Sequence, residues 1–185
     1  DGLAYRLPKG SDMILSTHFH PSGKKEIEVS TVGFYFSKEP PKQKFTGVQL
    51  PPAFGALAGV DIPAGESNYT KKDSFVLPID VKAFGISSHA HYLGKRMNMT
   101  ATFPNGELKE LLTISDWDFS WQEQYRYKDY VFLPPGTRLE AEVVWDNSED
   151  NINNPNDPPK RISWGRESDD EMGSVTLQMV AANPT

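Results

Sequence analysis

Apolar and polar residues alternate with a period of two along most of this chain, which is the pattern of β-strands with one buried face. In Met13–His20 the main apolar row lies on one face, and His18 and His20 lie on the other. The β-branched and aromatic run Thr31–Ser37 predicts another strand, which ends before Pro40. Further strands are predicted at Leu57–Ile62, Tyr69–Leu77, Val81–Ala90, Asn98–Phe103, Leu108–Ile114, Tyr125–Leu133, Arg138–Asp146 and Val175–Val180.

Turn and loop signals separate these strands. Asn105-Gly106 predicts a type I′ hairpin, because both central residues of that turn have a positive φ. Asn147–Lys160 is rich in Asn, Asp and Pro and predicts a long surface loop. No stretch keeps a helical period long enough to indicate a helix. The sequence therefore predicts an all-β fold, an antiparallel β-sandwich of jelly-roll type, with residues 1–185 forming a single domain.

Composition narrows the possible partners. The net charge is −6, and Lys and Arg are interspersed with acidic residues, which argues against binding to nucleic acid. The chain has no cysteine, so a metal would have to be held by nitrogen, oxygen or thioether ligands. No apolar run is long enough for a membrane span. No signal-like segment precedes the first strand, and we expect the chain to be a processed piece of a longer one.

The four histidines fall into two His-x-His pairs, and each pair opens a seven-residue frame that ends in Gly-Lys. The frames are His18–Lys24 and His89–Lys95. Random placement would produce two such pairs about once in a few thousand chains of this length. Residues i and i+2 of a strand share a face, so each pair presents two imidazoles to one point. Each pair is therefore half of a possible metal site, and it binds weakly unless other ligands are added.

The second pair has the better surroundings for a metal. On the strand that leads to His89 and His91, the predicted neighbours on the same face are small and leave room for a metal and a gas-sized ligand. These neighbours are Val81, Ala83, Gly85 and Ser87. The alternative is that both histidines are ordinary sheet residues bonded to backbone carbonyls. Neutral imidazoles accept zinc, copper or nickel, so a third ligand must select the metal.

The frame His89–Lys95, followed much later by Asp170-Glu171-Met172, resembles the signature of the copper type II, ascorbate-dependent monooxygenases. This is the family of peptidylglycine α-hydroxylating monooxygenase and dopamine β-hydroxylase. Its catalytic domain consists of two copper-bearing β-sandwiches, and this chain resembles the second sandwich over nearly its whole length. The resemblance implies that the chain is the C-terminal part of a larger protein, in which an N-terminal domain supplies the rest of a second copper site.

The resemblance also assigns ligands. His89, His91 and Met172 correspond to the ligands of the oxygen-binding copper and form the expected catalytic centre. His18 resembles the one ligand that this domain lends to the electron-transferring copper, whereas His20 has no ligand role in the resemblance. From the residues alone, however, both His18 and His20 are candidate metal ligands.

Donor chemistry supports copper at the second pair. A thioether is a soft, weak donor that favours Cu(I), so two histidines and Met172 would keep copper reducible, whereas zinc prefers a harder third ligand. Methionine is more often a filler of the hydrophobic core. The polar flank Glu167–Glu171 and the following Gly173 argue against deep burial of Met172.

The sequence departs from the family at the places that select the substrate. The peptide-amidating branch has an arginine two residues before the His-x-His pair, and an asparagine and a tyrosine just after the methionine. Here these places hold Ser87, Ser174 and Thr176. Without a guanidinium to fix a terminal carboxylate, peptidylglycine is not the expected substrate. The family's disulfides are also absent, which suggests a bacterial protein that is periplasmic or secreted.

We therefore expect a copper-dependent monooxygenase domain that uses O2, an external reductant such as ascorbate and an organic substrate of unknown identity, and that hydroxylates an unactivated C–H bond. One alternative is a copper-binding or storage module without turnover, and another is an interaction domain with incidental histidines. A hydrolase built on Ser87, Ser88, His89 and Asp116 is disfavoured, because no nucleophile elbow is present. The aromatic stretch Trp117–Tyr127 is interpreted as sandwich core rather than a sugar cleft.

Overall fold

A computed structural model of the chain describes residues 3–17, 19 and 21–183. The chain divides into two units, residues 1–44 and residues 45–185. The first unit has no strand at any described position in 4–42, so the strands predicted at Met13–His20 and Thr31–Ser37 are wrong there. Many of its apolar side chains are exposed, with Ile14 at 90% and Tyr35 at 99%. An alternating segment forms a strand only when a partner takes up its backbone hydrogen bonds, which the pattern alone does not supply.

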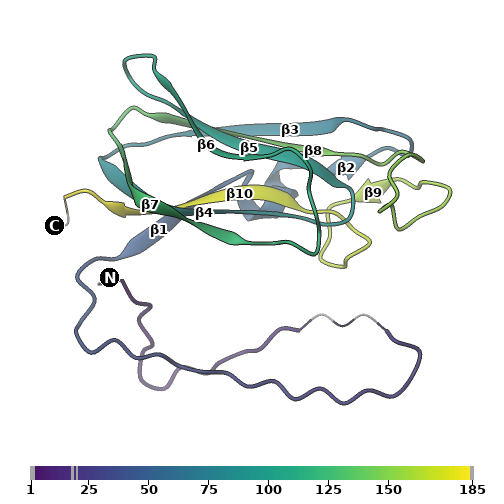
Figure 1. Ribbon diagram of the computed structural model, residues 1–185, viewed down its shortest axis with the longest axis horizontal. Helices are drawn as coiled ribbons and strands as arrows, with labels where there is room; N and C mark the ends of the chain where they lie inside the picture. The colour runs from purple at the N-terminus through teal and green to yellow at the C-terminus, as the bar shows by residue number, and fades with distance from the viewer. Residues whose placement is uncertain (1–2, 18, 20, 184–185) are drawn as a thin grey trace. The chain divides into compact units, whose positions relative to one another are not determined.

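The second unit is an antiparallel β-sandwich, which confirms the predicted all-β fold (Figure 1). Two sheets of four strands each make up its layers. The first sheet has the strand order β1-β10-β4-β7, the second sheet has the order β3-β8-β5-β6, and β2 pairs with β9 separately. The bounds are β1 Phe45–Leu50, β2 Asp61–Ile62, β3 Tyr69–Val76, β4 Val81–Ala90, β5 Gly94–Thr102, β6 Leu108–Ile114, β7 Gln124–Leu133, β8 Arg138–Trp145, β9 Ile162–Ser163 and β10 Gly173–Ala181.

The core lies between the two four-stranded sheets. Alternate residues of the central strands β4, β10, β5 and β8 are buried there, as the period of two requires. Its largest side chains that are almost wholly enclosed include Trp145, Met97, Met99, Leu139 and Leu177. Burial of this apolar surface is the main driving force for the sandwich.

Two local predictions were corrected or refined. Of the strand predicted at Leu57–Ile62, only Asp61–Ile62 is extended, as β2, whereas Leu57 and Ala58 end the 3-10 helix η1 at Pro52–Ala58. The prolines and glycines of this segment interrupt an extended chain. The β5–β6 hairpin is confirmed, but only Gly106 of the Asn105-Gly106 pair has a positive φ. The hydrogen bond from Phe103 N to Glu107 O shows a longer loop than the two-residue type I′ turn.

The predicted surface loop after β8 is confirmed, except at its first residue. Asn147 is completely buried, and its side-chain amide donates hydrogen bonds to the backbone oxygens of Ile62, Pro63 and Lys160. These bonds tie the two ends of the loop to the chain near β2. The first residue of the loop is therefore held in the protein interior, whereas the rest of the loop lies at the surface.

A β-bulge divides strand β4 into two halves. Against β10, Ala83 pairs with Met179 and Gly85 pairs with Gln178, so Phe84 is an extra residue in that ladder. Ala83 and Ile86 both face the core, although an uninterrupted strand would place them on opposite faces. The predicted single face from Val81 to His91 is therefore wrong: beyond the bulge, His89 lies on the outer face of the first sheet, away from the second sheet.

Candidate metal centre

His89 and His91 lie together at the end of β4. His89 is the penultimate residue of the strand and half-buried, and His91 follows the strand and is buried. Their ring centroids are 5.2 Å apart, with the ring planes nearly perpendicular. The structure therefore brings the two predicted ligands side by side, as the His-x-His spacing indicated.

The Nδ1 atoms of both histidines contact hydrogen-bond acceptors. His89 Nδ1 lies 2.6 Å from Gln122 Oε1, and His91 Nδ1 lies 3.0 Å from the backbone oxygen of Asp170. The Gln122 amide nitrogen donates to Phe119 O, which sets its oxygen toward His89. Both acceptors call for a hydrogen on Nδ1, which makes Nε2 the nitrogen with the lone pair in each neutral ring. Histidines that bind metals usually have this kind of partner behind the ring.

The surroundings of His89 favour the neutral imidazole. Burial lowers the pKa of His89 below its usual value, and nearby His91 acts in the same direction, while the hydrogen bond with Gln122 raises it. The neutral form is the one that binds metals. The ring of Phe54 stands edge-on to His89 with centroids 5.3 Å apart, and Phe119 is 6.1 Å from His91. Two aromatic rings thus flank the histidine pair.

Phe54 is held at this position by an unusual backbone. Its φ is +54°, in the left-handed region that residues other than glycine seldom adopt. Gln49 Oε1 accepts a hydrogen bond from Phe54 N, and Trp164 Nε1 donates one to Phe54 O. The two bonds fix the backbone that aims the Phe54 ring at His89.

Met172 is brought to the same end of the first sheet by strand pairing. Gly173, the first residue of β10, pairs with Ala90, and continuing the register by one residue sets Met172 opposite His91. Met172 is half-buried, and its backbone oxygen accepts a hydrogen bond from Trp145 Nε1. A Cβ on Gly173 would lie 2.1 Å from the Trp145 ring, so only glycine allows this close approach of the two chains.

The acidic residue before Met172 is not part of a surface flank, contrary to the sequence-based expectation. Glu171 has no exposed surface, and its carboxylate accepts hydrogen bonds from four N–H groups. The donors are the backbone N–H groups of His91, Leu93 and Met172 and the indole of Trp145. Burial raises the pKa of Glu171 to about 8, against the lowering effect of these bonds.

Gly94 and Lys95, which end the second frame, contact residues from other parts of the sandwich. Trp117 Nε1 donates to His91 O, and a Cβ on Gly94 would lie 2.5 Å from the Trp117 ring. Lys95 Nζ bonds the Asp146 carboxylate at 2.9 Å. The Gly-Lys that closes the frame is therefore explained by packing and an ion pair, without contact with a ligand.

The first pair, His18 and His20, lies outside the described residues. In the part of the chain that the structure describes, no cluster of three or more His, Asp and Glu side chains is arranged to hold a metal ion. The second pair contributes two such residues, and its third predicted ligand is the thioether of Met172. The donor set fits a soft metal such as Cu(I) better than zinc.

The positions at which the sequence departs from the copper monooxygenase pattern adjoin His89. Thr176 pairs with Ser87, and Ser174 pairs with His89, so β10 and β4 place all three small residues next to the histidine pair. Ser174 is 1% exposed, and its hydroxyl has no hydrogen-bond partner among the described residues. A buried polar group without a partner is uncommon and is consistent with a small ligand at this place.

The competing readings of the sequence have less support. His89 bonds Gln122, whereas a catalytic triad would require its ring to bond Asp116 or a serine. Trp117 is buried, and Tyr125 and Tyr127 pack against the core, which confirms the core interpretation for these three aromatics. Trp121 is exposed instead.

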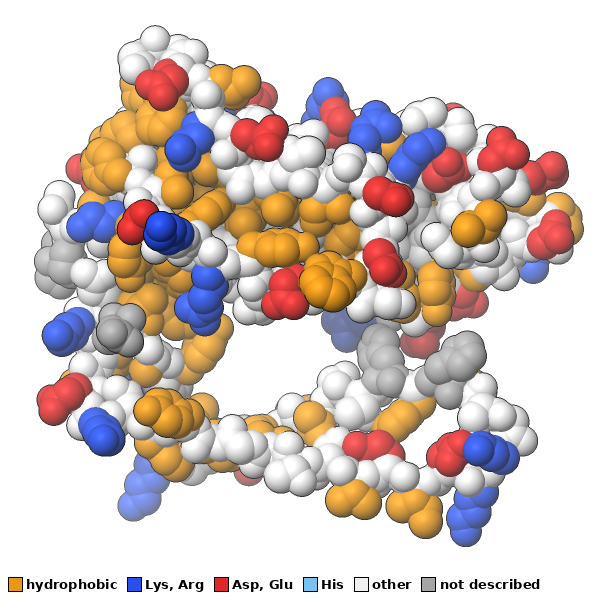
Figure 2. All heavy atoms as spheres, viewed as in Figure 1, with side chains coloured by type: hydrophobic (Ala, Val, Ile, Leu, Met, Phe, Trp, Pro, Cys, Tyr) orange, Lys and Arg blue, Asp and Glu red, His pale blue; other side chains and the backbone are white. Residues whose placement is uncertain are grey.

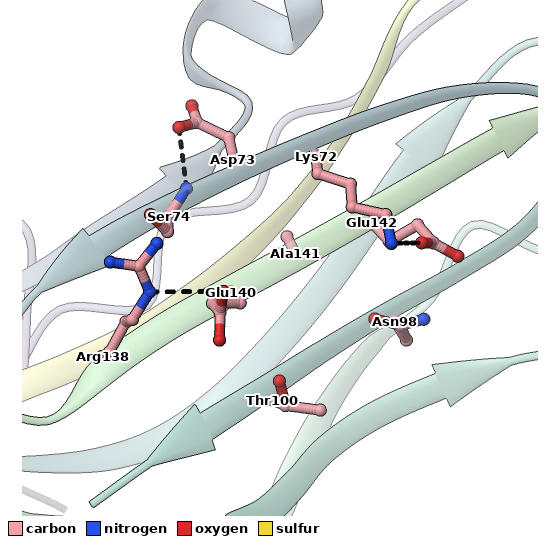
Figure 3. A pocket seen from close by; sticks show the side chains of 9 residues that line it. All are labelled: Lys72, Asp73, Ser74, Asn98, Thr100, Arg138, Glu140, Ala141 and Glu142. Atoms are coloured by element: carbon pink, nitrogen blue, oxygen red, sulfur yellow. Dashed lines mark hydrogen bonds and ion pairs between the residues drawn. The ribbon is translucent and has the colours of Figure 1, made fainter.

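A hollow over the second sheet is different in character. It has a volume of about 520 Å³, lies over the outer face of the sheet and is lined mostly by charged and polar side chains of β3, β5 and β8 (Figure 3). Four of its charged side chains form ion pairs, Lys72 with Glu142 and Arg138 with Glu140. On the face seen in Figure 2, described Lys and Arg side chains likewise lie among Asp and Glu side chains. Paired charges of this kind are typical of a solvated sheet face.

The residues that contact the two histidine rings could not have been predicted from the sequence. They lie far from the histidines along the chain, and no spacing rule connects them: Gln122, Phe54 and the backbone of Asp170. Glu171 stands next to Met172 in the sequence, but the sequence did not predict that its side chain is buried. In the described part of the chain, no helix is long and apolar enough to cross a membrane.

No family model and no curated protein matches the chain. Among solved structures, it is similar to part of the structure of infectious bursal disease virus Gx strain, with 9% identity and a TM-score of 0.34, covering 83% of this chain and 37% of that chain. The structure of the Gt strain of that virus has 10% identity and a TM-score of 0.26, covering 77% and 36%. This chain thus spans less than two thirds of either viral chain, and likenesses at these TM-scores carry no argument on function.

Proposed function

We propose that this chain is the domain of a copper-dependent monooxygenase that holds the O2-activating copper with His89, His91 and Met172. The observation that carries the proposal is the paired histidines, each with Nδ1 against an acceptor, at the end of β4 that pairs with the start of β10, directly after Met172. Copper held there would supply the reduction of O2 that is coupled to hydroxylation of a C–H bond. The proposed partners are an external reductant such as ascorbate, an organic substrate and a domain with the second copper, in the periplasm or outside the cell.

The residues of the chain have separate tasks in this proposal. The two imidazoles bind the metal in their neutral form, which burial of His89 favours. Gln122 and the Asp170 carbonyl hold the ring orientations. Phe54 and Phe119 limit the access of water to the pair. Ser174 and Ser87 leave space beside His89 for an uncharged group of the substrate.

Metal binding and turnover are tested separately. The protein is loaded with Cu(I), and X-ray absorption at the copper edge should show a sulfur ligand together with nitrogen ligands. The variant Met172→His should lose the sulfur signal and shift the site toward Cu(II) and zinc, because imidazole is a harder donor than a thioether. An unchanged preference for Cu(I) over Cu(II) would remove Met172 from the ligand set.

Consumption of O2 with ascorbate distinguishes a monooxygenase from the alternative of a copper-binding module. It should be measured with the longest natural chain that contains this domain, since a single copper supplies only one electron. Substrate-dependent O2 consumption that disappears in His89→Ala supports the monooxygenase. Tight copper binding without any O2 consumption in that full chain would contradict it and leave the binding module.

A further inference from the structure

Between the two segments that carry the proposed copper ligands lies a buried carboxylate. Glu171 is fully enclosed, and it comes directly before Met172 in the chain. Its Oε2 accepts hydrogen bonds from His91 N at 3.0 Å and from Met172 N at 3.1 Å. One oxygen atom therefore holds the backbones of two ligand residues that are 81 positions apart in the sequence.

The same carboxylate is tied to the rest of the sandwich. Oε2 also accepts from Trp145 Nε1 at 3.0 Å, and Oε1 accepts from Leu93 N at 2.6 Å. Trp145 belongs to β8 of the second sheet, and its indole also donates to Met172 O. The two ligand segments are thus fastened to each other and to a rigid core residue through one side chain.

This arrangement does more than fill space in the core. An apolar residue of similar volume would leave four buried N–H groups without an acceptor. Because two of these donors are His91 N and Met172 N, the carboxylate defines the separation of the His91 and Met172 backbones. Metal sites need such support, because a weak thioether ligand binds only if its approach to the metal is already set.

We propose that Glu171 is a positioning residue that sets the Met172 thioether at bonding distance from the copper held by His89 and His91. This inference rests on the proposed copper site. Glu171 itself does not contact the metal or the substrate. Its removal should leave the two histidines able to bind copper while the sulfur ligand is lost.

The test compares Glu171→Gln with wild-type protein and with Glu142→Gln. The glutamine has the same shape, but an NH2 group replaces one of the two carboxylate oxygens, so the side chain cannot accept all four hydrogen bonds and turns a donor toward an N–H group. Glu142 is a carboxylate of the second sheet that pairs with Lys72, and it serves as the matched control. Copper-edge X-ray absorption and competition with a Cu(I) chelator are measured on protein whose fold is checked by circular dichroism.

We expect Glu171→Gln to fold, to lose the sulfur signal and to bind Cu(I) about 10- to 100-fold more weakly, the usual range for partners behind a metal ligand. Glu142→Gln should keep both the signal and the affinity. A folded Glu171→Gln protein with an unchanged sulfur signal and unchanged affinity would overturn the positioning role.

Two further outcomes are kept distinct. If Glu171→Gln does not fold, Glu171→Asp decides, since it keeps the carboxylate but is one methylene too short to reach His91 N and Met172 N as Glu171 does; an undiminished sulfur signal in that folded variant overturns the proposal. If wild-type protein binds no copper at all, the proposed function fails. A wild-type site with a sulfur ligand that is insensitive to Glu171 refutes the positioning role alone.

Discussion

The two Gly-Lys endings of the histidine frames are identical in sequence and different in surroundings. In the first frame, a Cβ on Gly23 would meet nothing within 4 Å, and Lys24 pairs with Glu26 at the surface. In the second frame, Gly94 lies against the Trp117 ring, and Lys95 pairs with the half-buried Asp146. A repeated motif therefore does not imply a repeated site. The second frame is built into a sandwich, and its parts are supported from several strands.

The largest expected difference between the frames is in copper affinity. His89→Ala and His91→Ala should each abolish stoichiometric Cu(I) binding at the tight site while leaving the fold intact, because the core of a sandwich this size supplies most of the stability. His18→Ala and His20→Ala should leave that site unchanged and remove only copper that mild chelators extract. Competition with a series of chelators, combined with circular dichroism, measures both effects.

Two equally tight copper sites in wild-type protein would contradict this difference. Unfolding of His89→Ala or His91→Ala would instead assign these histidines a structural role.

The next largest difference concerns the two glycines. Gly94→Ala should lower the free energy of unfolding by about 1–3 kcal/mol, because the added Cβ would lie 2.5 Å from Trp117 and 2.9 Å from Ala90. Gly23→Ala should have a smaller effect on the sandwich, since the strain of its positive φ falls on a turn of the other unit. Urea unfolding followed by tryptophan fluorescence compares the variants. Equal losses would show that the packing of Trp117 does not distinguish the frames.

The smallest difference concerns the two lysines and is visible at acidic pH. Burial raises the pKa of Asp146, but hydrogen bonds from Lys95 and Ser148 outweigh it, so the pKa lies below its usual value of 3.8. The unfolded chain therefore binds this proton first, and the stability from the pair is present above about pH 3.8 and is lost as the pH falls through the folded value.

Lys95→Met should raise the pKa of Asp146 and reduce stability at neutral pH by at most about 1 kcal/mol, with the difference from wild type vanishing in acid. Carboxyl NMR titration and unfolding at several pH values measure these effects. Lys24→Met should change neither quantity. A pKa of Asp146 that is the same with and without Lys95 would remove the ion pair as its cause.

The sequence alone predicted most of the strands of the second unit, and the reason is local. A half-buried strand repeats every two residues, so β3 to β8 and β10 were visible in the alternation of apolar residues. The alternation pattern gave a wrong prediction for Met13–His20 and Thr31–Ser37, where the described residues form no strand. It was also wrong for Leu57 and Ala58, which belong to the 3-10 helix η1. Whether an alternating segment finds a partner strand is a long-range property, which the local pattern does not contain.

At the candidate site, the sequence by itself determined that His89 and His91 share one side of the chain, because i and i+2 do so in any strand. Only the tertiary structure decided what surrounds them. The bulge at Phe84 changed which face of the sheet carries His89, and the pairing of β10 with β4 brought Met172, which directly precedes β10, to the end of β4. Glu171 is buried, where it accepts hydrogen bonds from His91, Leu93 and Trp145. These features depend on hydrogen bonds between segments far apart in the chain, and the register of such bonds is chosen when the sheets pack, not by the order of residues within one strand.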